Sequence, residues 1–515
     1  MQNNNMGAKA RYDVAIVGAG LNGLATAAYL AKAGKSVAVF EAREEVGGTM
    51  STVEFAPGYR AATVFDTVET LHPLLTSELG LAGHGLKFLK GQGTTVVHDS
   101  ETATRIDSDD PQLAELSTFV RRLGEALERV WTEPLPVAEP TGIGGIVDVL
   151  KMGWALRRLG KKDFPEALRF LPMCVFDVLN DHIQDDTLKA AIAASALSAA
   201  WMAPRSPGSA YGLVHHCPPW AGGLARDAVF AEGGPGAVSQ AIAAAARAAG
   251  AHIETSSPVT SVRIENGRAT GVILGDLVVE AGTVVSALDP KTTLLDLVGP
   301  RWMDPDFVER TQQVRGRGGL TVLRLALDKL PTFPGGQDVS KGRIQIGGRM
   351  DDIELAWDAA KYGELPQKPL LTCTIPTALD GSLAPAGHHV MVVHAQFTPH
   401  DLRGSDWADE REAFGDRVVG MLDACAPGLA KSVLHRQIAS PADIAEEFGL
   451  SGGCVHHADL ALDQLLYMRP IPGWYGYRMP IEGLYLCGPG THPGGAGTGL
   501  SGRNAAKQIL ADIKG

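Results

Sequence analysis

The chain has few cysteines, and their spacing suggests neither a cross-linked framework nor a metal centre. Redox pairs and cysteine metal sites show short spacings such as CxxC. Only six cysteines occur in 515 residues, and they are scattered as Cys174, Cys217, Cys373, Cys425, Cys454 and Cys487. We therefore expect reduced, buried thiols in a cytoplasmic protein.

An excess of basic residues is also missing. Lys and Arg number 46 against 58 Asp and Glu, which gives a formal net charge of −12. Proteins that bind nucleic acids neutralise phosphates with clustered Lys and Arg. The composition therefore argues against a nucleic-acid partner.

Long hydrophobic runs are absent as well. The longest nearly apolar run, residues 190–203, is shorter than the roughly 20 residues that span a bilayer. The N-terminal stretch MQNNNMGAKARYD is polar, so we expect no secretion signal. One predicted helix in residues 142–162 combines an apolar face with basic residues, which would suit contact with a membrane surface and a lipid-like substrate. Packing of this helix on its own domain is the alternative.

The most informative feature present is a dinucleotide fingerprint, DVAIVGAGLNGLATAAYLAKAGKSVAVFE, at residues 13–41. An apolar strand leads into Gly18, Gly20 and Gly23, an Ala-rich helix follows, and a second strand ends at Glu41. These glycines permit a tight turn, the approach of a pyrophosphate and close packing of helix on strand. The helix N-terminus favours phosphate, and the acid can accept hydrogen bonds from a ribose diol. The segment predicts a dinucleotide site.

The rest of the chain is long enough for a second domain or for one large discontinuous domain. Paired glycines in REEVGGT, Gly47 and Gly48, allow the chain to pass close to whatever lies on the first helix. Residues 65–230 read as mostly helical, with helices predicted at 112–131, 142–159 and 187–201. A helix at 237–249 precedes predicted strands at 252–255, 259–265, 269–274 and 277–287, and Asn266 and Gly267 mark a hairpin turn. Strands at 320–327, 370–375 and 389–397, with helices such as 407–425, predict a mixed sheet with helices on one side.

A second glycine-rich segment closes the chain. A short strand at 484–487, a loop rich in glycine and a helix from about Ser501 follow one another, without the continuation of a second fingerprint. The loop either packs the last helix or places backbone amides near Gly490, Thr498 and Gly499 against a flavin. A cofactor that uses both ends and a middle segment is more extended than NAD, so FAD fits better.

Several segments together resemble the phytoene desaturase and carotenoid isomerase type of flavoprotein. These are DVAIVGAGLNGLATAAYLAKAG, EAREEVGG, EGGPGAVSQAIA, GRATGV and GLYLCGPGTHPGGAGTGLSGRNAA. Within that type, LKAAIA, APRSPGSAY and LDQLLYMRPIPG resemble most the branch called pyridine nucleotide-disulphide oxidoreductase domain-containing protein 2. The resemblance spans nearly the full length of the chain.

The resemblance implies an α/β (α+β) protein with a Rossmann-type FAD-binding domain of monoamine-oxidase-like fold, a mixed-sheet substrate domain and a helical insert. We assign residues 11–75, 230–290 and 480–515 to the FAD-binding domain, and 76–229 and 291–479 to the substrate domain. It also implies non-covalent FAD and a hydrophobic or alicyclic substrate. Matching cofactor-contact positions are Gly18, Gly20, Gly23, Glu41, Arg43, Gly48, Val259, Gly488, Gly490 and Thr498, to which we add Ala19, Asn22, Ala42, Thr49 and Gly499. The chain reads Ser286-Ala287-Leu288-Asp289 where carotenoid desaturases often read SNAD, which argues against a carotenoid substrate.

Flavin chemistry requires a C–H bond held against the ring and a group that takes the neighbouring proton. Imidazole suits proton transfer near neutrality, so His492, His457 and His216 are candidate bases, with structural roles as the alternative. Tyr477, in a cluster of aromatic residues before the last strand, is a further candidate. Two histidine pairs, His215-His216 and His456-His457, do not show the spacing of a metal site with their neighbours.

The reaction that the sequence favours is removal of a hydride and a proton across a C–C bond. An amine oxidase, a redox-neutral polyene isomerase and a flavin-binding protein without turnover are the alternatives. Because only one dinucleotide fingerprint is visible, a separate NAD(P)H site is not supported. We expect oxygen, a quinone or another carrier to accept the electrons.

Overall fold

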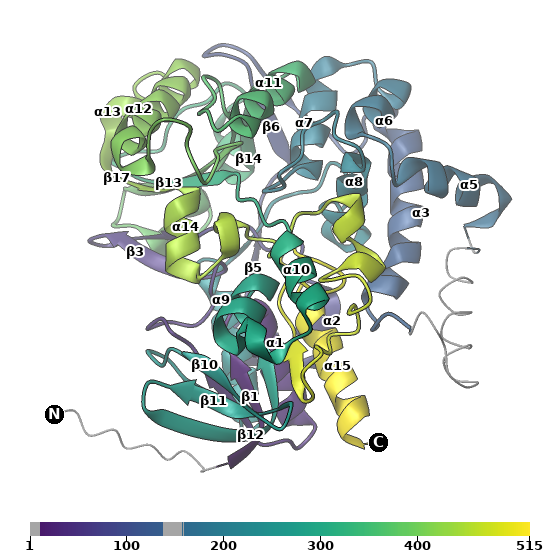
Figure 1. Ribbon diagram of the computed structural model, residues 1–515. Helices are drawn as coiled ribbons and strands as arrows, with labels where there is room; N and C mark the ends of the chain where they lie inside the picture. The colour runs from purple at the N-terminus through teal and green to yellow at the C-terminus, as the bar shows by residue number, and fades with distance from the viewer. Residues whose placement is uncertain (1–10, 137–156, 158, 515) are drawn as a thin grey trace.

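Two large β-sheets organise the chain (Figure 1), and the computed structural model describes residues 11–136, 157 and 159–514. The first sheet has the order β10-β11-β12-β1-β2-β9, with β18 paired to β12. Its strands are β1 (Arg11–Val17), β2 (Val37–Phe40), β9 (His252–Glu254), β10 (Ser261–Glu265), β11 (Arg268–Leu274), β12 (Leu277–Ser286) and β18 (Leu484–Leu486).

The second sheet has the order β17-β13-β16-β15-β14-β6-β7. Its strands are β6 (Thr94–Val97), β7 (Ala103–Arg105), β13 (Leu320–Leu327), β14 (Arg343–Ile346), β15 (Leu370–Thr374), β16 (His389–Gln396) and β17 (Val433–Ala439). Two smaller sheets pair β3 (Thr52–Ala56) with β4 (Tyr59–Ala62), and β5 (Phe88–Lys90) with β8 (Val229–Ala231).

The helices fill the space between and around the sheets. They are α1 (Leu21–Lys32), α2 (Pro73–Glu78), α3 (Ala114–Trp131), α5 (Gly160–Phe170), α6 (Val175–His182), α7 (Asp186–Ala196), α8 (Gly212–His215), α9 (Gly236–Ala248), α10 (Pro305–Gln313), α11 (Met350–Lys361), α12 (Trp407–Cys425), α13 (Leu429–Ser432), α14 (Pro441–Phe448) and α15 (Leu500–Lys514). In Figure 1, α3, α5, α6, α7 and α8 gather on one side of the second sheet's region. Among the described residues, no helix combines the length and apolar character that crossing a membrane requires.

The predicted fingerprint forms as β1, α1 and β2, with β1 parallel to both β2 and β12. Close packing of helix on strand depends on Gly23, where a Cβ atom would lie 2.1 Å from the carbonyl oxygen of Gly18. At the other end of the chain, α15 packs on α1, and the backbone N–H of Gly502 donates to Oδ1 of Asn22 at 3.0 Å. The first and last helices of the described chain, α1 and α15, therefore pack together beside the first sheet.

The hairpin predicted at Asn266 and Gly267 is confirmed. β10 and β11 pair antiparallel, and both turn residues have positive φ, 52° and 77°. Such angles are those of a type I′ turn, which matches the twist of the strands it joins.

The mixed second sheet is also confirmed, with one parallel pair, β14 and β6, among antiparallel neighbours. Alternate residues of its strands face opposite sides. One face packs apolar residues, among them Ile344, Leu371 and Val393, against α12. The opposite face of the same strands carries polar residues, Gln345 and His394 among them, beside apolar residues of β13 and β16. The sheet therefore offers an apolar face to helices and a face that includes polar residues to the interior of the molecule.

The central region is less helical than predicted, since it contributes β5, β6 and β7. The helix predicted at 187–201 ends at Ala196, because the side chain of Gln396 binds the chain that follows it: Nε2 donates to the Leu197 carbonyl at 2.6 Å, and Oε1 accepts from the Ala199 N–H at 3.3 Å. The helix predicted at 142–159, and with it the predicted contact with a membrane surface, lies almost wholly outside the described residues.

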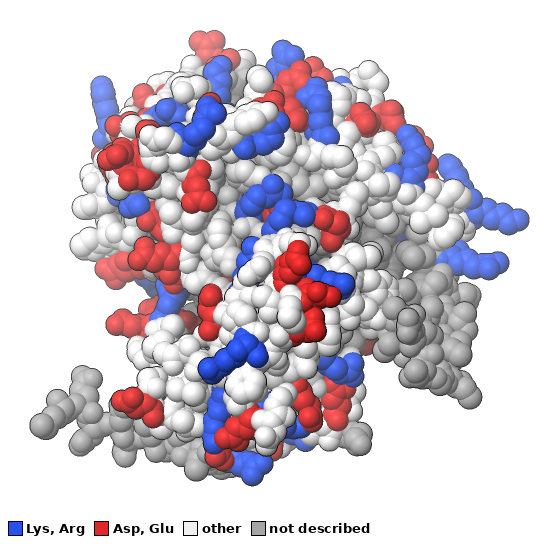
Figure 2. All heavy atoms as spheres, in the orientation of Figure 1, with Lys and Arg blue, Asp and Glu red and all other residues white. Residues whose placement is uncertain are grey.

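The division into 11–75, 230–290 and 480–515 on one side, and 76–229 and 291–479 on the other, stays a prediction. Every strand of the first sheet falls in the first set of ranges, and every strand of the second sheet in the other. Across the face seen in Figure 2, basic and acidic side chains are interspersed. Many form exposed pairs such as Arg205 with Asp351 at 2.7 Å, which contribute little to stability.

Candidate active site

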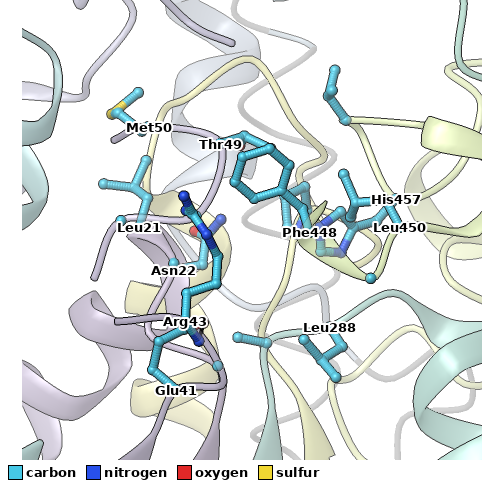
Figure 3. A pocket seen from close by; sticks show the side chains of 18 of the residues that line it. Leu21, Asn22, Glu41, Arg43, Thr49, Met50, Leu288, Phe448, Leu450 and His457 are labelled. Atoms are coloured by element: carbon cyan, nitrogen blue, oxygen red, sulfur yellow. Dashed lines mark hydrogen bonds between the residues drawn. The ribbon is translucent and has the colours of Figure 1, made fainter. Parts of the chain in front are cut away.

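A groove of about 310 Å³ opens where β1 and β2 end and α1 begins (Figure 3). One wall comes from the fingerprint and the turn after β2, and the other from α14 and the segments around residues 457 and 496. Ligands of open α/β sheets bind at the carboxyl ends of the strands, so the location suits a dinucleotide.

The glycines of the fingerprint leave room for a pyrophosphate. Gly18 has φ of +92°, and the backbone at Gly20 pairs with Gly47 of the REEVGGT turn. The φ of Gly20, −70°, is one that any residue adopts, so its backbone does not require glycine. A Cβ atom there would meet no described atom within 4 Å, so the position opens onto free space. No side chain caps the N-terminus of α1. Empty space beside an uncapped helix N-terminus is what a bound phosphate requires.

Glu41 directly follows β2, and its carboxylate is held in place by the backbone. Its side chain is buried; Oε2 accepts from the N–H of Ala19 at 2.6 Å, and Oε1 accepts from the N–H of Arg43 at 3.1 Å. A carboxylate has about four acceptor positions. The two backbone bonds fix the carboxylate and leave each oxygen able to accept a further hydrogen bond.

Arg43 reaches across the groove to α14. Its Nη2 lies 2.8 Å from Oε1 of Glu447, and its guanidinium lies 4.6 Å from the ring centre of Phe448. Figure 3 shows the guanidinium of Arg43 next to the ring of Phe448. The contact links the first sheet to the helix that follows β17.

Most of the predicted cofactor residues line this groove. Those on its surface are Gly18, Gly20, Asn22, Glu41, Ala42, Arg43, Gly48, Thr49 and Val259. Ala19 and Gly23 lie behind that surface, where Ala19 binds Glu41 and Gly23 packs on Gly18. The residues that hold an FAD stay a prediction, and their arrangement fits the ADP part of that cofactor.

In the C-terminal loop, the residues that line the groove differ by a few sequence positions from the residues predicted to do so. Gly495, Ala496 and Gly497 line it, together with Pro489. Four predicted contacts are not among the lining residues: Gly488, Gly490, Thr498 and Gly499. They pack behind it, since a Cβ atom at Gly490 would lie 2.8 Å from Pro290 and one at Gly499 would lie 2.2 Å from Leu75.

Two predicted catalytic residues, His492 and Tyr477, line neither this groove nor the cavity described next. Nε2 of His492 donates to the Val130 carbonyl at 3.0 Å, and the hydroxyl of Tyr477 donates to the His492 carbonyl at 2.8 Å. Burial lowers the pKa of His492 to about 4 and raises the pKa of Tyr477. His492 thus fixes the C-terminal loop against α3, and Tyr477 holds the same loop from the chain before β18.

A buried arginine completes the support of this loop. Arg469 is fully buried and donates to five carbonyls, those of His456, Ala458, Asp459, Gln464 and Pro489. It ties residues 456–464 to the loop that borders the groove. Arg469 lies in the segment LDQLLYMRPIPG, whose resemblance to the family did not predict this role.

A second, smaller cavity of about 80 Å³ lies beside the groove, and Phe65 and Ala496 line both. Its floor is the polar face of the second sheet, where Gln345, Thr372 and His394 are direct neighbours across three strands. Three charged side chains with little exposure, Glu69, Arg226 and Arg343, also line it, as do the half-buried Asp66 and several hydroxyls. Buried polar side chains in such number indicate a site that binds a polar molecule.

The candidate histidines divide between the two spaces. His457 lines the groove, whereas His216 lines the second cavity together with His456, whose Nε2 donates to the Ser198 carbonyl at 3.3 Å. Burial lowers the pKa of His456 and His457 to about 4 and that of His216 well below its ordinary value. All three are therefore neutral near pH 7, and Nε2 of His216 has no partner among the described residues.

A dinucleotide groove that adjoins a polar cavity suits an enzyme that holds a dinucleotide cofactor beside its substrate, and comparison with known proteins gives the family. A family model described as flavin containing amine oxidoreductase matches residues 21–395, so the chain belongs to this family. The resemblance seen in the sequence is confirmed, and the protein is an FAD-dependent enzyme.

The relatives span nearly the whole chain. A rat pyridine nucleotide-disulfide oxidoreductase domain-containing protein 2 is 34% identical, over 98% of this chain and 94% of the rat protein. A lycopene-forming phytoene desaturase of Paracoccus sp. is 26% identical, over 97% of each chain. Among solved structures, wild-type putrescine oxidase bound to putrescine superposes with a TM-score of 0.61 at 18% identity, covering 98% of this chain and 99% of that one. The monoamine-oxidase-like fold is thereby established.

Apart from His216, sequence reasoning missed the residues of the second cavity. Glu69, Arg226 and Arg343 come from three distant segments, none of which contains a motif. The sequence holds one signal of this cavity, which is the polar residues at alternate positions in strands β14 to β16. A strand that is covered on both faces normally has apolar residues throughout, so polar residues there indicate a polar space beside the sheet.

Proposed function

We propose that the protein is an FAD-dependent dehydrogenase or oxidase that takes a hydride and a proton from a small substrate bound in the second cavity. The observation that carries this proposal is the sharing of Phe65 and Ala496 by the groove and the cavity. FAD, when bound, accepts a hydride from a substrate carbon. The protein supplies the binding surface, the orientation and the group that takes the proton. Oxygen, a quinone or another carrier would then take the electrons.

The finer reaction that we favour is removal of hydrogen from neighbouring carbons, as the name of the related phytoene desaturase implies for that enzyme. The polar lining of the cavity favours a substrate with polar groups over the wholly hydrophobic or alicyclic molecule expected from the sequence. Oxidation of an amine is the second candidate, because the carboxylates of Asp66 and Glu69 line the cavity and carboxylates pair with ammonium groups.

Anaerobic reduction of the FAD-loaded protein tests the proposal. The protein is mixed without oxygen with polyenes, alicyclic compounds, amines and short carboxylic acids, and the flavin absorbance is followed. Bleaching by one class identifies the substrate class. Intact flavin absorbance with every class, under conditions where dithionite bleaches it, would contradict an oxidoreductase of this kind.

His216 is our candidate for the group that takes the proton, because it is neutral, lines the cavity and keeps an unpartnered Nε2. We expect His216→Gln to slow anaerobic flavin reduction about 10²- to 10⁴-fold without loss of FAD, the usual contribution of a positioned base. His394→Gln is the matched control, since His394 faces the same cavity but its Nε2 donates to the Val64 carbonyl at 2.8 Å. Equal rates of reduction in the His216 variant and the wild type would rule out this role.

A further inference from the structure

Three ionised side chains meet on the lining of the second cavity. Oε1 of Glu69 accepts from Nε of Arg226 at 3.2 Å and from Nη2 of Arg343, and all three residues are less than 10% exposed. They come from the chain before α2, the chain before β8 and strand β14. Buried charges are costly unless paired and hydrogen-bonded, so such a group calls for a reason beyond stability.

The hydrogen bonds within the group leave an excess of donors. Each guanidinium has five N–H donors. Arg226 also donates to Sγ of Cys217 at 2.9 Å, and Arg343 also donates to Thr67 Oγ1 at 3.2 Å and, at 3.5 Å, to the Arg226 carbonyl. None of the hydrogen bonds that the two arginines form with described residues uses Nη2 of Arg226 or Nε of Arg343. The hydroxyls of Thr94 and Thr372, on the same lining, likewise form no hydrogen bond there.

The net charge of the three side chains also favours an anionic ligand. Burial opposes the ionisation of Glu69, but the two guanidiniums outweigh it and hold its pKa below the ordinary value. Two buried cations therefore surround one buried anion. The nearby Asp66 balances part of this charge from the same lining, but its Oδ2 accepts from Thr374 at 2.6 Å and no hydrogen bond joins it to either arginine. The local group of three keeps one positive charge and spare N–H donors.

We propose that the cavity binds a carboxylate group of the substrate, held by Arg226 and Arg343. A planar carboxylate matches the fork of a guanidinium and accepts two parallel hydrogen bonds. Thr94 and Thr372 would donate to the same group or to a polar atom beside it. The inference rests on the proposed function, since it gives the substrate class for the same cavity.

Titration of the FAD-loaded protein with butyrate tests the proposal, with butyramide as a neutral probe of the same shape. We expect butyrate to perturb the flavin absorbance spectrum and to bind at least about tenfold more tightly than butyramide, roughly 1.4 kcal/mol. Arg343→Gln should remove this preference. Arg105→Gln, which changes an exposed arginine on β7 of the same sheet, should keep it.

A second variant keeps the test informative if Arg343→Gln does not fold. Among the described residues, Glu69 is the only carboxylate bonded to both guanidiniums, so Glu69→Gln removes that acceptor and butyrate should bind more tightly in the variant. Equal affinity for the two probes in the wild type, or butyrate affinity unchanged in Glu69→Gln, would overturn the carboxylate inference. A protein that holds FAD and is reduced by a substrate without a carboxylate overturns this inference alone, whereas a protein that holds no FAD overturns the proposed function.

Discussion

Replacing Gly20 with valine is expected to abolish FAD binding and to leave the fold intact. The backbone at Gly20 has φ of −70°, which any residue adopts, and a Cβ atom there meets no atom within 4 Å. The backbone and the Cβ position therefore accept the substitution, and the added side chain points into the space that the pyrophosphate needs. We expect FAD affinity to fall at least about 100-fold, roughly 3 kcal/mol, measured by titrating the apoprotein with FAD.

Two other glycines provide the controls for this experiment. Gly420→Val adds the same side chain to the exposed face of α12, where a Cβ atom also meets nothing within 4 Å, and should leave FAD affinity unchanged. Gly23→Ala should instead lower stability, because its Cβ would lie 2.1 Å from the Gly18 carbonyl oxygen. Wild-type FAD affinity in Gly20→Val would show that the pyrophosphate does not approach this turn.

Acidification from pH 6.5 to 4 is expected to remove a large part of the folding stability. Burial lowers the pKa of His456, His457 and His492 to about 4 and that of His215 to about 3. An unfolded histidine takes up its proton near pH 6.5. Between that pH and about 4 the unfolded chain binds protons that the native protein does not, so stability is present above 6.5 and is lost as the pH falls. Each such histidine contributes on the order of 3 kcal/mol.

Urea unfolding of the FAD-loaded protein at half-unit steps of pH measures this loss. We expect the midpoint to fall steeply below pH 6.5, because several such histidines together are comparable with the roughly 5–15 kcal/mol of a typical domain. His492→Gln keeps a donor for the Val130 carbonyl and should reduce the steepness. His435→Gln, at an exposed position, should not change it. A midpoint independent of pH over this window would show that these histidines are not buried in neutral form.

The first sheet was predictable because its signals are local. Gly18, Gly20, Gly23 and Glu41 act within 30 residues, and the turn at Asn266 and Gly267 is defined by two neighbours. The sequence predicted that the C-terminal loop borders the groove but not which of its residues do so, since Ala496 rather than Gly490 lines the groove. Which amide of a glycine-rich loop faces a ligand depends on packing against distant residues.

The catalytic candidates show where sequence reasoning ends. His492 was attractive because it lies in the glycine-rich loop, yet its ring turns to α3 and the Val130 carbonyl. The cavity beside the groove is built in part by Glu69, Arg226 and Arg343. Each of these residues is more than 100 positions from the next in the sequence, and they share no motif. Their meeting depends on how β14 sits beside the chain that precedes α2, which is a property of the tertiary fold.

The absorbance spectrum of the purified protein, before and after incubation with excess FAD and removal of the free cofactor, tests the central claim most directly. We expect flavin bands, with a maximum at about 450 nm, that stay with the protein and disappear on anaerobic addition of a substrate. A spectrum without flavin bands after that incubation would contradict it, because the groove at Gly20 and Glu41 would then have failed to hold the cofactor for which its shape is suited.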